Sequence, residues 1–266
     1  MNKFLQIFKI SFHQEFAYRI NFIMWRVRNM FQIFLVFFLW DTIFANSQRI
    51  VFGYDRQKML TYIFGLIIVR ALVLSSKANE VGGDISRGDI INLLLKPISY
   101  VKYWLTRDLS SKGINLIFAV FETILLYFIL RPDFFLQGNI LLLLSFATSI
   151  VLAILIYFLL LFTIGLVPFW VPESAWGISF LMLVVVEFLS GALFPLDILP
   201  VSVQSIINFT PFPYLLFFPL QIYLGKVGTL IMLRGIGVSF LWLGVLWLLM
   251  RSVWFKGLKS YQAYGR

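Results

Sequence analysis

Asn139 to Val167 read NILLLLSFATSIVLAILIYFLLLFTIGLV, a stretch in which no side chain carries a charge. About 20 apolar residues are enough for a helix to cross the hydrocarbon core of a bilayer. The stretch therefore predicts a membrane-spanning helix, and Pro168 and Pro172 are expected to end it, because proline interrupts helical hydrogen bonding. Other apolar stretches lie on either side of it in the sequence, and these do contain charged residues.

The whole chain has the composition of a membrane protein. Of its 266 residues, 61% are hydrophobic, 18% are aromatic and 13% are charged, whereas a soluble domain has about 25% charged residues. A soluble fold of this size could not cover so much apolar surface, so lipid must be the solvent for most of the chain. The absence of cysteine excludes disulfides, thiolate metal sites and a cysteine nucleophile.

Hydropathy predicts an all-α fold with six transmembrane helices in a single domain, residues 1–266. The predicted spans are residues 21–45, 59–76, 113–130, 139–167, 175–189 and 227–250. The longest hydrophilic stretch, residues 77–112, lies between the second and third spans. An even number of spans places both termini on the same side of the membrane.

Residues 2–17 predict an amphipathic helix rather than a span. At 100° per residue, its polar and apolar side chains fall on opposite arcs. The polar arc holds Asn2, Lys3, Gln6, Lys9, His13 and Gln14, and the apolar arc holds Phe4, Leu5, Phe8, Phe12 and Phe16. Such a helix lies in the membrane interface with its aromatic side chains at the acyl boundary.

Residues 191–225 are apolar but contain five of the nine prolines. No straight span fits here, because proline lacks the backbone N–H and clashes with the preceding helical turn. We expect two short half-helices that enter the membrane from the outer side and return, buried in protein or facing a wet cavity. The residues expected to shape this re-entrant region are Gly191, Pro195, Pro200, Pro211, Pro213 and Pro219.

The net charge of +10 is explained by membrane orientation without a nucleic-acid partner. Residues 1–28, 77–112 and 251–266, which fall on one side of the predicted topology, carry fifteen Lys and Arg residues. The other side carries five. Because cytoplasmic loops are enriched in Lys and Arg, this bias predicts that both termini are cytoplasmic.

Arg26 and Arg28 mark the wet end of the first predicted span, whose apolar part is residues 30–40. Four charged residues fall inside the other predicted spans: Arg70, Glu122, Glu187 and Arg234. A charge at the bilayer centre costs at least ~2.5 kcal/mol, so each should form an ion pair or reach water. The two arginines are long enough to extend their charge towards an interface. The two glutamates are not, which makes them the stronger candidates for a role in transport, with structural pairing as the alternative.

The sequence gives little support for catalysis. There is no G-x-x-x-x-G-K-[ST] phosphate loop, so the chain is not expected to hydrolyse ATP. His13 is the only histidine, and neither a metal site nor a Ser-His-acid set can be assembled around it. We therefore predict no catalytic residues, no metal and no cofactor in this chain.

The order of these features resembles the membrane-spanning permeases of ABC-2 exporters. The resemblance is sharpest at residues 80–97 (EVGGDISRGDIINLLLKP), which are similar to the family's coupling segment. Residues 190–200 (SGALFPLDILP), followed by 211–214 (PFPY), resemble its re-entrant region near the external gate. The tail at residues 257–265 (GLKSYQAYG) is the third similarity.

This resemblance implies a permease in the plasma membrane, the inner membrane in bacteria, that works with two copies of a cytosolic ATPase. ATP and Mg²⁺ would bind to that ATPase and not to this chain. The subgroup it most resembles has about 260 residues per permease and often pairs two different permeases. A second copy or a sister permease, and membrane lipid, are therefore the other expected partners.

The residues of the coupling segment also support an interpretation that does not depend on the resemblance. Asp89 is expected to cap a short helix that Pro97 stops. Along that helix Ile90, Ile91, Leu94 and Leu95 form an apolar stripe, which needs a partner surface in the cytosol. The alternative is that the stripe packs on the membrane or on the chain's own spans. The residues assigned to ATPase coupling are Glu80, Gly88, Asp89, Ile91, Leu94, Leu95 and Pro97.

The leading hypothesis is therefore a dimeric export pore driven by a separate ATPase, of unidentified substrate. One alternative is a secondary transporter coupled to protons through Glu122 or Glu187, which would act without an ATPase. Another is a membrane-embedded lipid-modifying enzyme, which would need catalytic polar residues clustered at one depth. The spans offer no such cluster.

Overall fold

The computed structural model describes residues 6–12, 19–44 and 50–261, and their regular structure is helical apart from one β-bridge between Val51 and Tyr54. The all-α class is therefore confirmed. The α-helices named here are α2 (Arg19–Ile43), α3 (Arg56–Val73), α4 (Val81–Ser86), α5 (Ile90–Leu94), α6 (Tyr100–Leu130), α7 (Ile140–Ile164), α8 (Ala175–Leu189), α9 (Val201–Ile207), α10 (Phe217–Tyr223) and α11 (Thr229–Ser260). The short 3₁₀ segments are η1 (Lys77–Glu80), η2 (Val167–Phe169), η3 (Pro172–Ser174), η4 (Leu196–Ile198) and η5 (Phe212–Tyr214).

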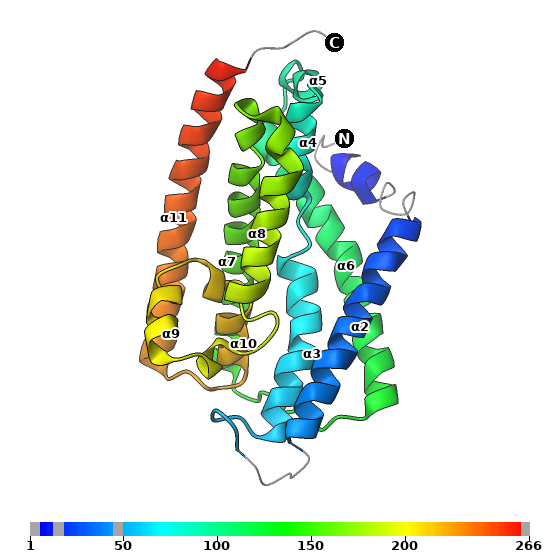
Figure 1. The fold of residues 1–266 in the computed structure, drawn as a ribbon, viewed down its shortest axis with the longest axis vertical. Coiled ribbons are helices and arrows are strands. Elements are labelled where there is room, and N and C mark those ends of the chain that lie inside the picture. Colours follow the sequence, from blue (N-terminus) through cyan, green and yellow to red (C-terminus); the bar gives the residue numbers. More distant parts are fainter. Residues whose placement is uncertain (1–5, 13–18, 45–49, 262–266) are drawn as a thin grey trace.

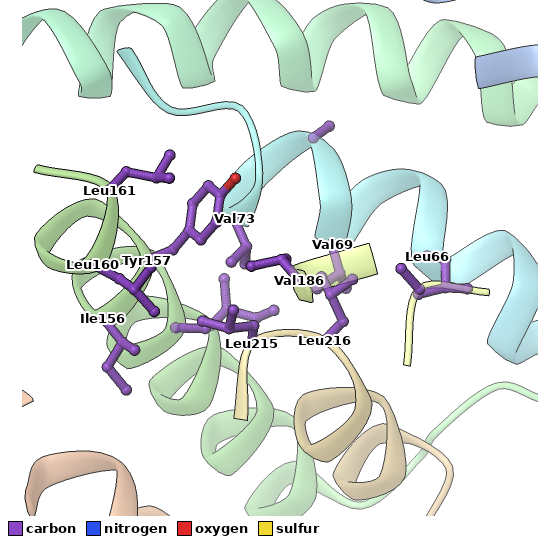
Figure 2. Close-up of a cluster of buried hydrophobic side chains, with 14 of the residues drawn as sticks. Leu66, Val69, Val73, Ile156, Tyr157, Leu160, Leu161, Val186, Leu215 and Leu216 are labelled. Carbon is purple, nitrogen blue, oxygen red and sulfur yellow. The ribbon is translucent and has the colours of Figure 1, made fainter. Parts of the chain in front are cut away.

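The uncharged helix α7 lies at the centre of the bundle, where α3, α10 and α11 pack around it. Asn139 caps its first turn by accepting a hydrogen bond from the backbone N–H of Leu141 at 2.9 Å. Figure 2 shows side chains of α3, α7, α8 and the segment before α10 meeting in one apolar cluster. Its labelled members are Leu66, Val69, Val73, Ile156, Tyr157, Leu160, Leu161, Val186, Leu215 and Leu216.

Two glycines of α11 allow this helix to approach its neighbours closely. A Cβ at Gly235 would overlap the ring of Phe218 on α10, and one at Gly257 would overlap the ring of Phe169 on η2. In lipid, helices associate mainly through van der Waals packing, because the surrounding acyl chains are as apolar as the side chains. Small residues at these contacts therefore decide how tightly the bundle closes.

Among the described residues, four helices are long and apolar enough to cross a membrane. They are α6, α7 extended through η2, η3 continued by α8, and α11. Helix α3 becomes a fifth candidate when it is joined to the η1–α4 segment across a bend of 50°. The predicted first span, α2, is not among these helices of the described part of the chain, and the count of six remains a prediction.

Two helices extend well beyond the predicted spans that they contain. Helix α6 begins at Tyr100 rather than Gly113, and α11 continues to Ser260 rather than ending at Met250. Residues 77–112 are therefore not one hydrophilic connection, because their last third forms the first turns of α6. The prediction failed because it treated charged residues as solvated, whereas Asp108 and Lys112 are buried and paired inside the protein.

The predicted interfacial helix, residues 2–17, is helical where the structure describes it, at residues 6–12. Phe8 and Ile10 are exposed there, Ser11 is buried, and the carbonyl of Phe8 accepts a hydrogen bond from Ser110 of α6 at 3.0 Å. The remaining residues of the prediction, 2–5 and 13–17, lie outside the described part. Its position in the membrane interface stays a prediction.

The bundle has two distinct ends (Figure 1). Helices α4 and α5 and the C-terminal end of α11 lie together at one end, and α9, α10 and the first turn of α3 lie at the other. After the roles and orientation predicted from the sequence, we call the first the coupling end and the second the outer end. The chain thus separates its two unusual sequence regions, residues 80–97 and 191–225, by the length of the spans.

Candidate functional site

At the coupling end, α3 stops at Val73 and the chain bends before η1. Such a break leaves backbone groups without helical partners, and buried backbone groups must be hydrogen-bonded. An ion pair on α6 supplies the partners: Asp108 accepts from the hydroxyl of Ser76 at 2.5 Å and the backbone N–H of Lys77 at 2.8 Å. Lys112 donates to the carbonyl of Ser75 at 3.0 Å.

Asp108 and Lys112 are themselves 3.2 Å apart and almost completely enclosed, with side-chain exposures of 0% and 5%. They therefore connect α6 to the bend between α3 and η1. The ion pair joins two spans to the segment that protrudes beyond them, so the two cannot move independently without breaking it.

Beyond the bend, α4 and α5 are joined by a turn at Gly88, which has a φ of +81°. This left-handed conformation favours glycine, because other side chains clash there. Glu80 holds the start of the segment through ion pairs with Lys77 at 2.9 Å and with Arg107 of α6 at 3.2 Å. The segment is thus positioned by defined contacts and is not a loose loop.

The predicted apolar stripe of α5 divides into a buried part and an exposed part. Ile90 is completely buried against the protein's own core. Ile91, Leu94 and Leu95 remain 36%, 43% and 81% exposed. We call these three side chains the α5 ridge. The alternative of packing on the chain's own spans is therefore correct for Ile90 and incorrect for the ridge.

The prediction that Asp89 caps α5 is wrong in its chemistry. Asp89 occupies the N-cap position, but its backbone is helical and its side chain makes no capping hydrogen bond. The carboxylate instead accepts from Nε of Arg87 at 3.0 Å. Helix α5 ends at Leu94, before the exposed Pro97, as expected from the position of the proline.

Aromatic side chains join α4, α6 and α11 at the coupling end. The hydroxyl of Tyr100 donates to Asp84 of α4 at 2.6 Å, and its ring stacks on that of Trp254 of α11, with 5.1 Å between centroids. Trp254 also meets Phe169, which in turn contacts Tyr261 at 5.5 Å. The coupling segment and the beginning of the tail, two of the regions singled out in the sequence, therefore meet at one end of the protein.

In the middle of the bundle, three of the four intramembrane charges are paired. Arg70 of α3 donates to Glu187 of α8. Glu122 of α6 pairs with Arg26 of α2 at 3.2 Å, and Arg26 also donates to the side-chain oxygen of Asn115 at 2.6 Å. The expectation of ion pairs within the bundle is confirmed for both glutamates. Arg26, which the sequence indicated as the wet end of a span, is one of the partners.

Arg234 behaves differently from the other three. It lies on the exposed side of α11, and it makes no ion pair within the residues that the structure describes. Its position near the beginning of α11, at the outer end, leaves room for its long side chain to extend towards the interface.

Both ion pairs line one partly open cavity of about 180 Å³ between α2, α3, α6, α7 and α8. A shallower hollow beside it shares Arg28, Gln32 and Glu187 with the cavity and continues over Phe31 and Leu35. Cavities with polar walls hold water or ligand, whereas apolar ones stay dry. The polar side chains of the cavity wall are Arg26, Arg28, Asn29, Gln32, Arg70, Ser75, Asn115, Glu122, Tyr157 and Glu187.

At the outer end, the proline-rich region forms two short helices, α9 and α10, with 3₁₀ turns before each. The prolines start these elements: Pro195, Pro200 and Pro211 precede η4, α9 and η5, and Pro219 lies in the first turn of α10. These are the positions at which a missing N–H costs no hydrogen bond. The region thus contains two short helices, and the expectation that they are half-helices that enter a membrane and return remains a prediction.

The two short helices differ in burial. Helix α10 packs against α7 and α3, whereas α9 exposes Val201 and Ile206, and the turn after it exposes Phe209. Gly191 turns the chain with a φ of +84°, and its carbonyl accepts a hydrogen bond from the hydroxyl of Tyr62 at 2.7 Å. A side chain at Gly191 would collide with Tyr62 and Phe217.

A polar cluster fastens the outer region to the segment before α3, and we call it the outer latch. Lys226 donates to Asp197 at 2.8 Å, and the hydroxyl of Tyr54 donates to the same carboxylate at 3.2 Å. Gln221 also donates to Tyr54 and to Asp197. Burial and then the charge of Asp197 raise the pKa of Tyr54 above its usual value, so its hydroxyl stays protonated as a donor.

The sequence did not indicate the Asp108–Lys112 pair, the role of Arg26 or the outer latch. The only available signal for Asp108 and Lys112 was their spacing of four, which places opposite charges on one helix face. Arg26 and Glu122 lie 96 residues apart, and Tyr54 and Asp197 lie 143 apart. No local pattern links residues at such separations.

A helical bundle with several helices long and apolar enough to cross a membrane is the architecture of a multi-pass membrane protein. Comparison with protein-family models matches residues 30–265 to the family described as ABC-2 family transporter protein. The chain therefore belongs to the ABC-2 transporter family, as the resemblance predicted, and this implies that it is a permease of an ABC transporter. Comparison with curated proteins finds no match.

Proposed function

We propose that this chain is the membrane-spanning permease of an ATP-driven exporter and that a separate cytosolic ATPase binds its α5 ridge. The observation that carries the proposal is the exposure of Ile91, Leu94 and Leu95 on a helix that is otherwise rigidly held. Three neighbouring apolar side chains at the end of a bundle, outside the apolar spans, form a surface suited to a groove on another protein. The family membership specifies an ATPase as the class of partner.

The Asp108–Lys112 pair supports a route for the mechanical step. A movement of the ATPase would push on α5 and α4, which are joined to η1. Because Asp108 holds the start of η1 and Lys112 holds the bend after α3, displacement of η1 would be passed to α3 and α6 together. Both helices line the mid-bundle cavity, so their movement would change its shape.

The outer latch would close the other end of the path. Tyr54 belongs to the segment before α3, and Asp197 and Lys226 belong to the region before α11. A shift of α3 would therefore move Tyr54 relative to Asp197 and strain the hydrogen bonds of the latch. Opening of the latch would release the substrate on the outer side, as the position of the re-entrant region near the external gate implies.

The working unit we propose contains two permeases, either two copies of this chain or one copy with a sister permease, and two ATPase subunits. ATP and Mg²⁺ would bind only to the ATPase. The complex would lie in the plasma membrane, the inner membrane in bacteria, with both termini of the permease in the cytoplasm. The lipid-facing surface would be formed by exposed apolar residues such as Ile117, Phe121 and Phe128 of α6.

Purification of the complex is the first test of the proposed function. A tagged permease, extracted from its native membrane in a mild detergent, is expected to copurify with the ATPase encoded by an adjacent reading frame. The purified complex should hydrolyse ATP, and the permease alone should not, since it has no phosphate loop. A permease that moves its substrate in vesicles without any ATPase would contradict the proposal.

The orientation has a separate test in this cysteine-free background. Asp133→Cys is expected to react with an impermeant maleimide added to intact cells, because its exposed side chain lies at the outer end. Lys96→Cys, exposed at the coupling end, should react only after the membrane is opened. The reverse pattern would invert the topology.

A further inference from the structure

We propose that α4 and the beginning of α8 move as one body, so that a displacement of the coupling segment reaches the mid-bundle cavity through α8 as well as through α3 and α6. The proposal rests on the proposed function only in naming the ATPase as the source of the displacement. The joint movement itself belongs to the permease alone. The packing of α4, the burial of α8 and the position of one ion pair carry the proposal.

Helix α4 packs against η2, η3 and α8, the elements that follow α7 along the chain. Within α4, Val81, Gly82 and Ile85 are buried. A Cβ at Gly82 would lie 3.5 Å from the Cβ of Ala175, the first residue of α8, and 3.5 Å from Pro168 of η2. These are van der Waals distances, and a closely packed interior transmits strain because it has no space to absorb it. A push on α4 therefore acts directly on the first turn of α8.

The end of α7 meets α4 at the same place. A Cβ at Gly165, which follows α7, would lie 2.9 Å from the Cβ of Val81 and 3.3 Å from the backbone nitrogen of Gly82. Helix α7 is held along its length by α3, α10 and α11, whereas Val186 is the only buried residue of α8, every residue of which the structure describes. Of the two helices that α4 contacts, α8 is therefore the one that can follow its movement.

Helix α8 connects this contact to the cavity. Glu187 follows Ala175 by 12 residues on α8, which is about 18 Å along the axis at 1.5 Å per residue. Glu187 lines the cavity and accepts a hydrogen bond from Arg70 of α3. Displacement through α3 moves Arg70, and displacement through α8 moves Glu187. The two routes therefore meet at this ion pair, and a push on the coupling segment acts on both of its partners.

One test uses the purified permease in phosphatidylcholine nanodiscs, without ATPase. Leu183→Cys places a single thiol on α8 where that position lines the cavity. Adding Gly82→Leu inserts a side chain between α4 and α8, and the rate at which the thiol reacts with a methanethiosulfonate should change at least about threefold. The matched control is Gly177→Leu on α8, where an added Cβ would meet no described atom within 4 Å, and the rate should change less than about 1.5-fold. Equal rates for Gly82→Leu and this control would overturn the proposal.

A second test needs no bulky side chain, so it remains decisive if Gly82→Leu does not fold. In the cysteine-free chain, Gly82→Cys and Ala175→Cys place two Cβ atoms 3.5 Å apart, within the range of about 3.5–4.5 Å found in disulfides. In the assembled complex the disulfide should form to the same extent with and without vanadate-trapped ATP. The oxidised complex should hydrolyse ATP as fast as the reduced one. A disulfide that cannot form in the trapped complex, or that stops hydrolysis, would show that α4 and α8 separate during the cycle.

Failure of the proposed function would be seen separately, because it appears as a permease with which no ATPase copurifies. The reactivity of the thiol at position 183 in the permease alone would still show whether α8 follows α4. A reactivity that responds to Gly82→Leu as expected would then keep the joint movement and remove only the ATPase as its source.

Discussion

Asp108→Asn is expected to lower the free energy of unfolding by about 3–5 kcal/mol, the range found when one partner of a buried ion pair is removed. The substitution keeps the shape of the side chain but leaves the ammonium of Lys112, which is 5% exposed, without its counter-charge. It also weakens the acceptor for the backbone N–H of Lys77 and the hydroxyl of Ser76. The measurement is the midpoint of unfolding of the purified protein in mixed micelles of neutral and ionic detergent.

The matched control is Asp89→Asn, the same chemical change in an ion pair at the protein surface. Arg87 and Asp89 are 67% and 50% exposed, and such pairs contribute about 0–1 kcal/mol. Equal effects of the two substitutions would show that the Asp108–Lys112 pair does not hold α6 to the bend after α3. The route proposed for the mechanical step would then lose its physical basis.

Leu94→Asp is expected to abolish assembly with the ATPase while leaving the permease folded. In the free permease the side chain is 43% exposed, so a carboxylate there remains in water and should cost less than about 1 kcal/mol of stability. In the complex the same carboxylate would be buried without a partner. A loss of about 3 kcal/mol corresponds to binding more than about 100-fold weaker. Copurification and export would be measured together.

Two variants control for the added charge and for the location. Asn92→Asp places the same charge at an exposed position of α5 outside the ridge, and Lys102→Ala removes a solvated charge nearby on α6. Both should assemble and export nearly as the wild type does. If Leu94→Asp assembles as well as they do, the ridge is not the docking surface.

The sequence was sufficient for those features that depend on composition or on local pattern. Apolar stretches such as residues 139–167 predicted the spans, because burial in lipid requires a continuous apolar helix. The prolines predicted the interruption at residues 191–225, and they now begin short elements there. The exposed part of the α5 stripe was predicted from helical periodicity and needed only the structure to separate Ile90 from the ridge.

The partners of the charged residues inside the protein could not be predicted from composition or local pattern. Hydropathy scores Asp108 and Lys112 as solvated, and so it placed the start of α6 too late, although the two residues satisfy each other and the broken backbone. The partner of Glu122 could not be identified, because Arg26 lies 96 residues away and only the packing of α2 on α6 brings them together. Long-range pairing is a property of the fold, and it is not encoded in any local spacing.

Site-specific photocrosslinking at Leu95 tests the central claim most directly. The ridge residue Leu95 is 81% exposed, and Leu136 at the outer end, which is 80% exposed, is the matched control. With a benzoylphenylalanine at each position in the assembled complex, the account predicts an adduct with the ATPase at position 95 and none at position 136. An intact, ATP-hydrolysing complex that gives no ATPase adduct at position 95 would contradict it.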